Sequence, residues 1–490
     1  MANLIGYRDT EKSFPKLSPG PGDMGEKRKL NQKTLIKDFT SGNIAKQLLI
    51  FSIPFMMSNA LQVLYSLVDM MVVGKFIGSH GLAAVSIASQ LFIFMTMLGL
   101  GFSNGGQVLV AQYIGAKQYD RMNRTIGTLF SFLMGMGLFM TIIGLCFGNS
   151  ILELLNTPVE AFSMALDYTI ICSIGITFTY GYNMVAAVLR GLGDSKHPFL
   201  FIGIASVLNL IGDLLFIGVF EWGTKGAALA TILGQAISFL FSLGFLYQKK
   251  EELGFDFKKQ SLKVDPEISH LLVKLGIPFS VQSCAINISM MFVNSLVNGF
   301  GVYAAAVFGI GIKIDDIINK TTQGMAFANS TMCAQNLAAG HHRRVRKTVY
   351  MTLIYCSICY LIFSGIYLTM YQQMFGAFTD DQNVMALSFT FVSAIIWSFP
   401  AMTLMRGSHG FIRGLGNATL SLALGLLDAF VLRIGLSYLL GVVFNMGLFG
   451  FFLGYGLAAY GTGVPGMIYF LSGKWKSFKL IRETDAICRS

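Results

Sequence analysis

The sequence predicts an all-α polytopic membrane protein, with twelve transmembrane helices in two six-helix lobes related by an internal parallel repeat. The composition is the first reason: 54% of the 490 residues are apolar and 12% are charged, against about 25% charged residues in an ordinary soluble domain. The second reason is a series of twelve apolar segments. The third is a set of short motifs in the first half that recur in the second half.

Each predicted helix is an apolar segment of at least the length that a crossing needs, about 20 residues. The twelve segments lie at 46–73, 82–111, 126–147, 161–189, 198–220, 226–247, 270–298, 303–336, 348–371, 384–412, 418–444 and 448–472. Several are longer than the minimum, which indicates tilted or kinked helices. Pro54, Pro278 and Pro400 are the expected kink sites, because proline cannot donate its backbone hydrogen bond within a helix.

The basic residues predict the orientation of these segments. Thirty of the 36 Lys and Arg residues lie in the two tails and in every second loop, whereas the opposite loops hold only Lys75 and Lys225. Cytoplasmic loops are enriched in Lys and Arg, so both termini are expected in the cytoplasm and the chain in the plasma membrane. The orientation in the membrane therefore explains the net charge of +11, and no nucleic-acid partner is expected. The expected partner is the lipid bilayer. The protein is expected to be a monomer.

Four matches between the two halves reveal the repeat. The sequence RGLG at Arg190–Gly193 recurs at Arg413–Gly416, and IPF at Ile53–Phe55 recurs at Ile277–Phe279. The pair AQ at 111–112 recurs at 334–335, and MAL at 164–166 recurs at 385–387. Since six crossings separate the copies, both halves have the same orientation in the membrane, as in transporters built from parallel repeats.

The repeat divides the chain into five parts. These are a disordered cytoplasmic tail at 1–45, an N-terminal lobe at 46–247, a cytoplasmic inter-lobe loop at 248–269, a C-terminal lobe at 270–472 and a cytoplasmic tail at 473–490.

Polar side chains at membrane depth in the N-terminal lobe form the first candidate site. A charge near the bilayer centre costs about 2.5 to 3.5 kcal/mol on the insertion scale, so buried acids point to function. The stripe comprises Gln62, Tyr65, Ser66 and Asp69 on one helix face, Asn209 and Asp213 on another, and Thr231 and Gln235 on a third. These oxygen atoms suit a shared proton or a dehydrated Na⁺, the latter at Asp69, Asn209, Asp213 and Thr231. A static hydrogen-bond network that fixes helix packing is the other interpretation.

A second group lies in the eighth segment, where KIDDIINK holds Lys313, Asp315, Asp316 and Lys320. This group is interpreted either as structural ion pairs at helical spacing or as acids that line a cavity and attract a cationic substrate. Aromatic and Met side chains would give such a cavity an adaptable wall. The candidate substrate-cavity residues are Asp315, Asp316, Met402, Met405, Asn287 and Tyr180. Asp428 and Arg433 are spaced for an approximate ion pair.

Catalytic motifs are not found in the sequence. No metal-ligand spacing, no nucleophile with its base and no phosphate-binding glycine loop is present. The protein is therefore not expected to be an enzyme, and no cofactor is expected.

The motifs of this chain resemble those of the multidrug and toxic compound extrusion (MATE) family of cation-coupled antiporters. The resemblance covers about residues 45–470 and rests on IPFxxxxxxQxLYSLVDMMVVGKFIG with LAAVSIASQ, on VLRGLGDSKHP, on NLIGDLLFIGVFEWGTKGAALATILGQ and on the second RGLG. It implies two six-helix bundles around a central cavity that opens alternately to the two sides of the membrane.

The resemblance also implies a cation site in the N-terminal lobe. DinF-like members build this site from residues that match Gln62, Tyr65, Asp69, Asn209, Asp213 and Thr231. NorM-like members also use a Glu in the seventh helix and an Asp in the tenth, but PFSVQSCAINISMMF and SFPAMTLMRG contain no acid here. The departure favours coupling through the N-terminal lobe, and the resemblance leaves both H⁺ and Na⁺ open as the coupling ion.

Together, these observations favour a secondary active multidrug exporter that antiports amphipathic organic cations against H⁺ or Na⁺ by alternating access. A flippase for a lipid-linked precursor is the alternative, which would call for a strongly basic central cavity. A channel or a membrane enzyme has no motif in its favour.

Overall fold

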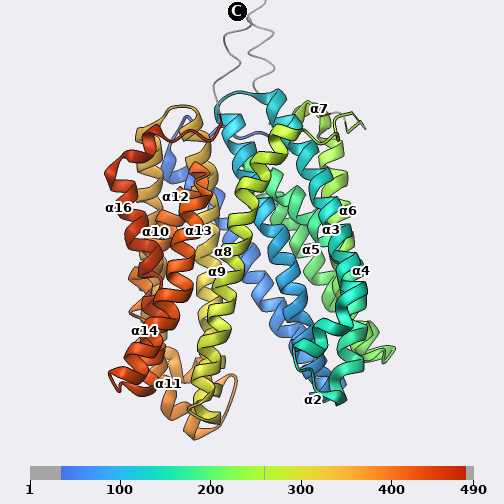
Figure 1. Ribbon diagram of the computed structural model, residues 1–490, viewed down its shortest axis with the longest axis vertical. Helices are drawn as coiled ribbons and strands as arrows, with labels where there is room; N and C mark the ends of the chain where they lie inside the picture. The colour runs from blue at the N-terminus through green and yellow to red at the C-terminus, as the bar shows by residue number, and fades with distance from the viewer. Residues whose placement is uncertain (1–34, 256, 259, 482–490) are drawn as a thin grey trace, which may run out of the picture.

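The structure is a computed structural model that describes residues 35–255, 257–258 and 260–481. In this part of the chain all regular elements are helical, and they form two bundles that stand side by side (Figure 1). Ten of the described helices are long and apolar enough to cross a membrane, and one bent pair of helices counts as an eleventh span. The protein is therefore a multi-pass membrane protein.

The N-terminal lobe contains six spans. Its elements are α2 (Ile44–Gly115), α3 (Tyr119–Leu154), α4 (Val159–Gly191), α5 (Lys196–Asp213) with the π-helical η1 (Leu214–Val219), and α6 (Gly223–Gln248). Helix α2 is broken at Gly78, where φ is 80° and ψ is −168°, and so supplies two spans, Ile44–Gly78 and His80–Gly115. Glycine adopts this positive φ without the steric cost of a Cβ atom.

The C-terminal lobe follows the short helix α7 (Lys250–Leu253). Its elements are α8 (Pro266–Asn298), α9 (Val302–Ala338), α10 (His342–Gly376), α11 (Gln382–Ile395), α12 (Ser398–Leu415), α13 (Ala418–Leu426), η2 (Leu427–Ile434), α14 (Gly435–Tyr438), η3 (Leu439–Val443), α15 (Gly447–Leu457), α16 (Tyr460–Ser472) and η4 (Lys474–Ser477). Helix α9 has 37 residues, but its charged residues lower its hydropathy, so it is not among the ten apolar spans. With α9 and the bent pair, the twelve predicted segments are all helical.

The one strongly bent span confirms one of the three expected kink sites. Helices α11 and α12 meet at 46°, and Pro400 lies in the first turn of α12, where its missing N–H group would otherwise be needed to continue the α11 ladder. Pro54 and Pro278 lie inside the helices α2 and α8, which continue on both sides of them.

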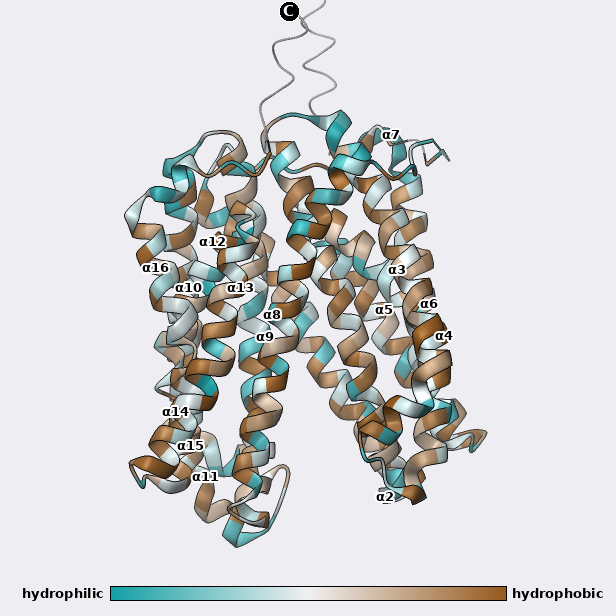
Figure 2. Cartoon of the chain, in the orientation of Figure 1, coloured by the Kyte–Doolittle hydropathy of each residue, from teal (hydrophilic) through white to brown (hydrophobic). Residues whose placement is uncertain are grey.

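The two lobes pack against each other at one end and separate at the other (Figure 1). We call the end that carries residues 35 and 481 the terminal end, and the opposite end the far end. Near the terminal end, Leu48 and Phe51 of α2 form a buried cluster with Ala328 and Met332 of α9. The hydrophilic residues gather mainly in the loops of this end, whereas the helices between the ends are largely hydrophobic (Figure 2).

The chain before α2 crosses the terminal end between the lobes. Most of the expected N-terminal tail, residues 1–34, lies outside the described residues. In the described part, Lys37 N donates to Leu192 O of the N-terminal lobe at 2.8 Å. Arg344 Nη2 of the C-terminal lobe donates to Phe39 O at 2.8 Å. This segment therefore links both lobes.

Candidate functional site

The polar stripe predicted in the N-terminal lobe is brought together by three helices. Tyr65 and Asp69 come from α2, Asn209 and Asp213 from α5, and Thr231 from α6. Tyr65 lies in electrostatic range of both Asp69 and Asp213. Gln62 is half-buried on the same face of α2, and its side chain makes no hydrogen bond with another described residue.

Asp69 and Asp213 form the centre of this site. Their carboxyl groups are close enough to hydrogen-bond when one of them carries a proton. Asp213 is fully buried, and neither of its oxygens nor Oδ1 of Asp69 has a donor among the described residues. No Lys, Arg or His side chain in the described chain pairs with either acid. Two adjacent carboxylates without a donor repel each other, so the pair requires a proton or a metal cation.

Neutral oxygen atoms lie beside this acid pair. Asn209 Nδ2 donates to Thr231 Oγ1 at 3.4 Å, and Thr231 Oγ1 donates to Ala227 O at 3.0 Å. The Asn209 amide therefore keeps its carbonyl oxygen for another partner. Carboxylate, amide and hydroxyl oxygens are the ligands that hard cations prefer, so this donor set fits Na⁺ as well as a proton. No described group of three or more His, Cys, Asp or Glu side chains is arranged to hold a metal ion.

The backbone beside Asp213 is unusual. Helix α5 ends at Asp213, and the next six residues, Leu214–Val219, form a π-helix. Such insertions are rare and occur frequently at functional sites. The corresponding span of the second half also contains a π-helix, η2, with Asp428 and Arg433 inside it.

Sequence reasoning missed the contribution of α4 to this site. Tyr168 is buried, its hydroxyl accepts a hydrogen bond from Ser89 Oγ at 3.4 Å, and it lies near Asp69 and Thr231. Cys172, one turn further along α4, is also buried within electrostatic range of Asp69. The spacing of these polar residues on the fourth segment was the available signal, but only the packing of α4 shows that they face the acids.

The C-terminal lobe holds a second buried polar cluster with a different charge balance. Arg433 Nη2 donates to Asp428 Oδ1 at 2.9 Å, and both side chains are buried, which confirms the expected pair. Asn319 Nδ2 donates to Asp315 Oδ2 at 2.6 Å, while Arg406 Nη2 donates to Asn319 O at 2.9 Å. Two acids are thus balanced by two guanidinium groups, whereas the acid pair of the N-terminal lobe has no such partner.

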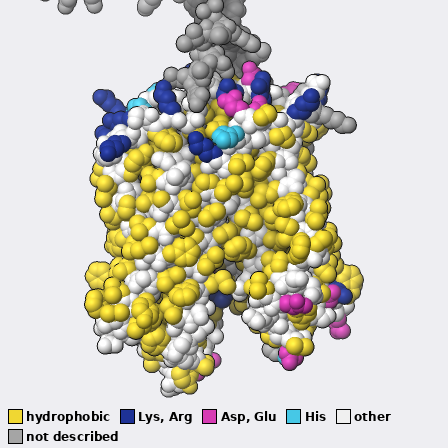
Figure 3. Space-filling view, in the orientation of Figure 1, with side chains coloured by type: hydrophobic (Ala, Val, Ile, Leu, Met, Phe, Trp, Pro, Cys, Tyr) yellow, Lys and Arg dark blue, Asp and Glu magenta, His cyan; other side chains and the backbone are white. Residues whose placement is uncertain are grey.

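The lobes enclose a hollow at the far end, visible between the two masses of side chains in Figure 3. At its base, Asn59 Nδ2 of α2 donates to Lys320 O of α9 at 2.7 Å. Asn287 Nδ2 of α8 donates to Met97 Sδ of α2 at 3.3 Å, which places Asn287 at the boundary between the lobes. We call this hollow the cleft.

The other candidate cavity residues lie at different depths. Asp316 is half-buried on α9, whereas Asp315 is buried inside the C-terminal lobe. Met402 is buried in the core of that lobe, and Met405 packs against the same core. Tyr180 is fully buried in the core of the N-terminal lobe, where its hydroxyl donates to Met95 O at 2.5 Å.

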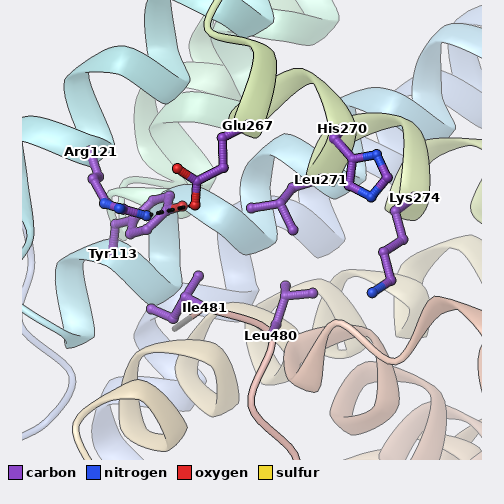
Figure 4. Close-up of a pocket in the computed structure, with 8 residues that line it drawn as sticks. All are labelled: Tyr113, Arg121, Glu267, His270, Leu271, Lys274, Leu480 and Ile481. Atoms are coloured by element: carbon purple, nitrogen blue, oxygen red, sulfur yellow. Dashed lines mark hydrogen bonds and ion pairs between the residues drawn. The ribbon is translucent and has the colours of Figure 1, made fainter. Parts of the chain in front are cut away.

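A separate cavity of about 410 Å³ opens at the terminal end (Figure 4). Its lining residues are Tyr113, Arg121, Glu267, His270, Leu271, Lys274, Leu480 and Ile481. Arg121 Nη1 pairs with Glu267 Oε1 at 3.1 Å. Leu480 and Ile481 pack on the core of the N-terminal lobe. This cavity lies where the chain after η4 crosses between the lobes, and it does not include the acid pair.

The family comparison agrees with the internal repeat. The MatE family model matches residues 54–215 and again residues 278–439. The two matches begin 224 residues apart (278 minus 54), which is the separation of the two IPF motifs. The repeat predicted from short motifs is therefore confirmed.

Curated relatives match along most of the chain. The "Probable multidrug resistance protein YpnP" of Bacillus subtilis is 31% identical over 446 residues, which cover 91% of this chain and 99% of that protein. The "Multidrug export protein MepA" of Staphylococcus aureus is 22% identical over 383 residues, which cover 78% of this chain and 83% of that protein.

Solved structures show the same fold. One is described as the "Outward-facing conformation of a multidrug resistance MATE family transporter of the MOP superfamily"; it has a TM-score of 0.84 and 22% identity and covers 90% of this chain and 99% of its own. A MOP superfamily transporter from Pyrococcus furiosus also has a TM-score of 0.84, with 22% identity and coverage of 90% and 98%. The family-model match over most of the chain and the 31% identical relative show that the chain belongs to the MatE family, the family of multidrug and toxic compound extrusion transporters that its motifs resemble.

Proposed function

We propose that this transporter is a secondary active multidrug exporter that antiports amphipathic organic cations against H⁺ or Na⁺ by alternating access. The observation that carries the proposal is the pair of half-buried Asp69 and fully buried Asp213, which has no basic partner among the described residues. The names of the curated relatives, a probable multidrug resistance protein and a multidrug export protein, support export of drugs. The comparisons give no support to the flippase alternative.

The acid pair supplies the coupling. Without H⁺ or Na⁺ bound, two adjacent charges of the same sign push Asp69 on α2 and Asp213 on α5 apart. Binding of one cation removes this repulsion and draws the two helices together, with Asn209 and Thr231 adding neutral oxygen ligands for Na⁺. A membrane potential contributes about 2.3 kcal/mol per charge per 100 mV. The exporter can use this energy only if occupancy of the acid pair changes the preferred conformation.

The contacts between the lobes suit a conformational change at the terminal end. Gln107 Nε2 of the N-terminal lobe donates to Thr331 Oγ1 of the C-terminal lobe at 2.9 Å, and Thr331 Oγ1 donates to Arg190 O of the N-terminal lobe at 3.3 Å. These are individual hydrogen bonds, each with a modest net free energy of about 0.5 to 1.5 kcal/mol. These hydrogen bonds can therefore be replaced by contacts at the far end when the cavity between the lobes opens to the other side of the membrane.

The charges at the two ends support an orientation with both termini in the cytoplasm of a plasma-membrane protein. Lys and Arg side chains gather at the terminal end in Figure 3, whereas acidic side chains are seen at both ends. With the positive-inside bias, the cleft of this structure opens to the outside.

Export by reconstituted protein tests the proposal. Liposomes that contain wild-type protein should export a cationic dye when an H⁺ or Na⁺ gradient is imposed. Asp69→Asn and Asp213→Asn should lose gradient-driven export but keep their folding, because the amide preserves the side-chain volume and cannot carry the charge.

The matched control is Asp167→Asn. Asp167 is a partly exposed acid whose Oδ2 lies 3.4 Å from Lys225 Nζ, at the surface. The Asp167→Asn variant should export the dye at the wild-type rate. Wild-type export by Asp69→Asn under a gradient would remove the acid pair from the coupling mechanism.

A further inference from the structure

Helix α9 has two differently charged faces. The inner face carries Asp315, whose side chain is buried in the C-terminal lobe and bonded to Asn319. The other face carries Lys313, Asp316 and Lys320, spaced at i, i+3 and i+7 on one side of the helix. Lys320 is exposed, and the other two side chains are half-buried.

Contacts with α2 show that this second face borders the cleft. Gly324, one turn from Lys320, packs so closely on Met56 that an added Cβ atom would lie 2.6 Å from Met56 N. At the next turn, Asn59 Nδ2 donates to Lys320 O at 2.7 Å. From this point toward the far end the lobes separate (Figure 1), so Lys320, Asp316 and Lys313 follow along the wall of the cleft. A basic side chain is visible inside the hollow in Figure 3.

The charges on this wall do not cancel. Among the described residues, none of the ion pairs within 4 Å includes Lys313, Asp316 or Lys320. Asp316 nevertheless lies within electrostatic range of both lysines. Two lysines and one aspartate leave one positive charge. A charge at this depth costs about 2.5 to 3.5 kcal/mol on the insertion scale, so Lys320, near the midpoint of a 37-residue helix, needs water or an anionic partner in the cleft.

The opposite lobe provides the complementary charge. Asp69 is half-buried and Asp213 is buried, and neither has a basic partner among the described residues. The N-terminal lobe therefore holds unpaired acids, whereas the wall of the cleft on the C-terminal lobe has an excess lysine charge.

We propose that Lys313 and Lys320 bind a carboxylate of the substrate, so that this exporter prefers amphipathic cations that also carry a carboxylate group. The inference rests on the proposed function and adds the substrate class. The cationic part of such a zwitterion faces the acid pair, and its carboxylate faces α9. A charge-assisted hydrogen bond to a lysine contributes more than a neutral one, which gives the carboxylate a measurable effect on affinity.

A matched pair of dyes tests the preference. Tetramethylrhodamine carries a cationic ring system and a carboxylate, and its methyl ester carries only the cation. Binding of each dye to the purified full-length protein is measured by fluorescence polarisation, without an ion gradient. Gradient-driven export of both dyes from proteoliposomes is measured separately.

Four variants separate the charge effect from misfolding. Lys313→Gln with Lys320→Gln should weaken binding of the acid dye about tenfold or more and leave the ester within twofold. Lys320→Arg should bind the acid dye as the wild type does, because it keeps the charge. Asp316→Asn should strengthen binding of the acid dye, since it removes a nearby negative charge. Lys225→Gln, at the surface, is the control and should change neither dye.

The possible results distinguish the two proposals. Equal losses for both dyes in the double lysine variant, or no loss of the acid dye, would overturn the assignment of the α9 wall. Lysine-dependent binding of the acid dye without any gradient-driven export would leave the substrate site in place and overturn the proposed function.

Discussion

Gln112 and Gln335 occupy the same position in the two halves of the repeat, and each donates a hydrogen bond to the backbone of the opposite half. Gln112 Nε2 donates to Gly414 O at 2.9 Å, and Gln335 Nε2 donates to Gly191 O at 3.4 Å. Both acceptors are the first glycine of an RGLG motif. The short motifs that reveal the repeat in the sequence therefore also hold the two lobes together at the terminal end.

Removing both amides should loosen this contact. Gln112→Ala with Gln335→Ala removes hydrogen bonds that each contribute about 1 kcal/mol, so the population opened at the terminal end should rise about tenfold or more. Spin labels at Tyr119 and Lys347, one on each lobe, should then show a longer distance. Gln372→Ala, at an exposed position, should leave the distance distribution unchanged. An unchanged distribution in the double variant would contradict the role given to these amides.

The segment before α2 should depend on Arg344. This guanidinium donates to the backbone oxygens of Phe39, Ser41 and Gly42 at 2.8 to 2.9 Å. Hydrogen bonds to a charged group contribute about 1.5 to 3 kcal/mol each, so Arg344→Ala should increase amide hydrogen exchange in residues 36–42 more than tenfold. Arg343→Ala, the exposed neighbour, serves as the control. Equal exchange in the two variants would show that the segment is held by other contacts.

Two glycines provide a sharp test of close packing between the lobes. At Gly115 an added Cβ atom would lie 2.1 Å from Gln335 O, whereas at Gly135 nothing lies within 4 Å. Gly115→Ala should therefore lower the melting temperature. It should also lower the fraction of molecules in which the two lobes are in contact at the terminal end. Gly135→Ala should raise stability by about 0.5 to 1 kcal/mol, since alanine is the better helix residue. Thermal unfolding in detergent compares the two variants. Equal stability would contradict the close contact between Gly115 and Gln335.

The buried pair of Asp428 and Arg433 should be structural. Asp428→Asn leaves the Arg433 guanidinium buried without its charge partner, which is expected to cost about 3 to 5 kcal/mol. Adding Arg433→Gln should recover much of this loss. Asp167→Asn removes a surface pair and should cost less than about 1 kcal/mol. Normal folding with complete loss of ion coupling in Asp428→Asn would instead assign coupling to the C-terminal lobe.

The sequence predicted the helices well because hydrophobic length is a local property of each segment, and because the repeat shows the same order of segments twice. All twelve segments are helical, and α9 was recovered although Lys313, Asp315 and other charged residues lower its hydropathy. The bend before Pro400 followed from the missing N–H group. At Pro54 and Pro278 the helices continue, because neighbouring groups can compensate for a lost hydrogen bond.

The site was predictable only in part, because helical spacing describes one helix at a time. The face of α2 with Tyr65 and Asp69 could be drawn from the sequence, and so could the face of α5 with Asp213. The packing of Tyr168 from α4 against these acids depends on how three helices meet. Spacing also gave no indication that Asp315 and Asp316, adjacent in sequence, point to the core and to the cleft.

Binding of substrate and occupancy of the acid pair should be linked, and such linkage is reciprocal. The most direct measurement is release of the coupling ion when a cationic dye is added to purified protein, followed with a pH indicator for H⁺ or a fluorescent indicator for Na⁺. Wild-type protein should release the ion on binding the dye, and Asp69→Asn and Asp213→Asn should bind the dye with no release. Release at the wild-type stoichiometry from dye-binding Asp69→Asn would contradict the account.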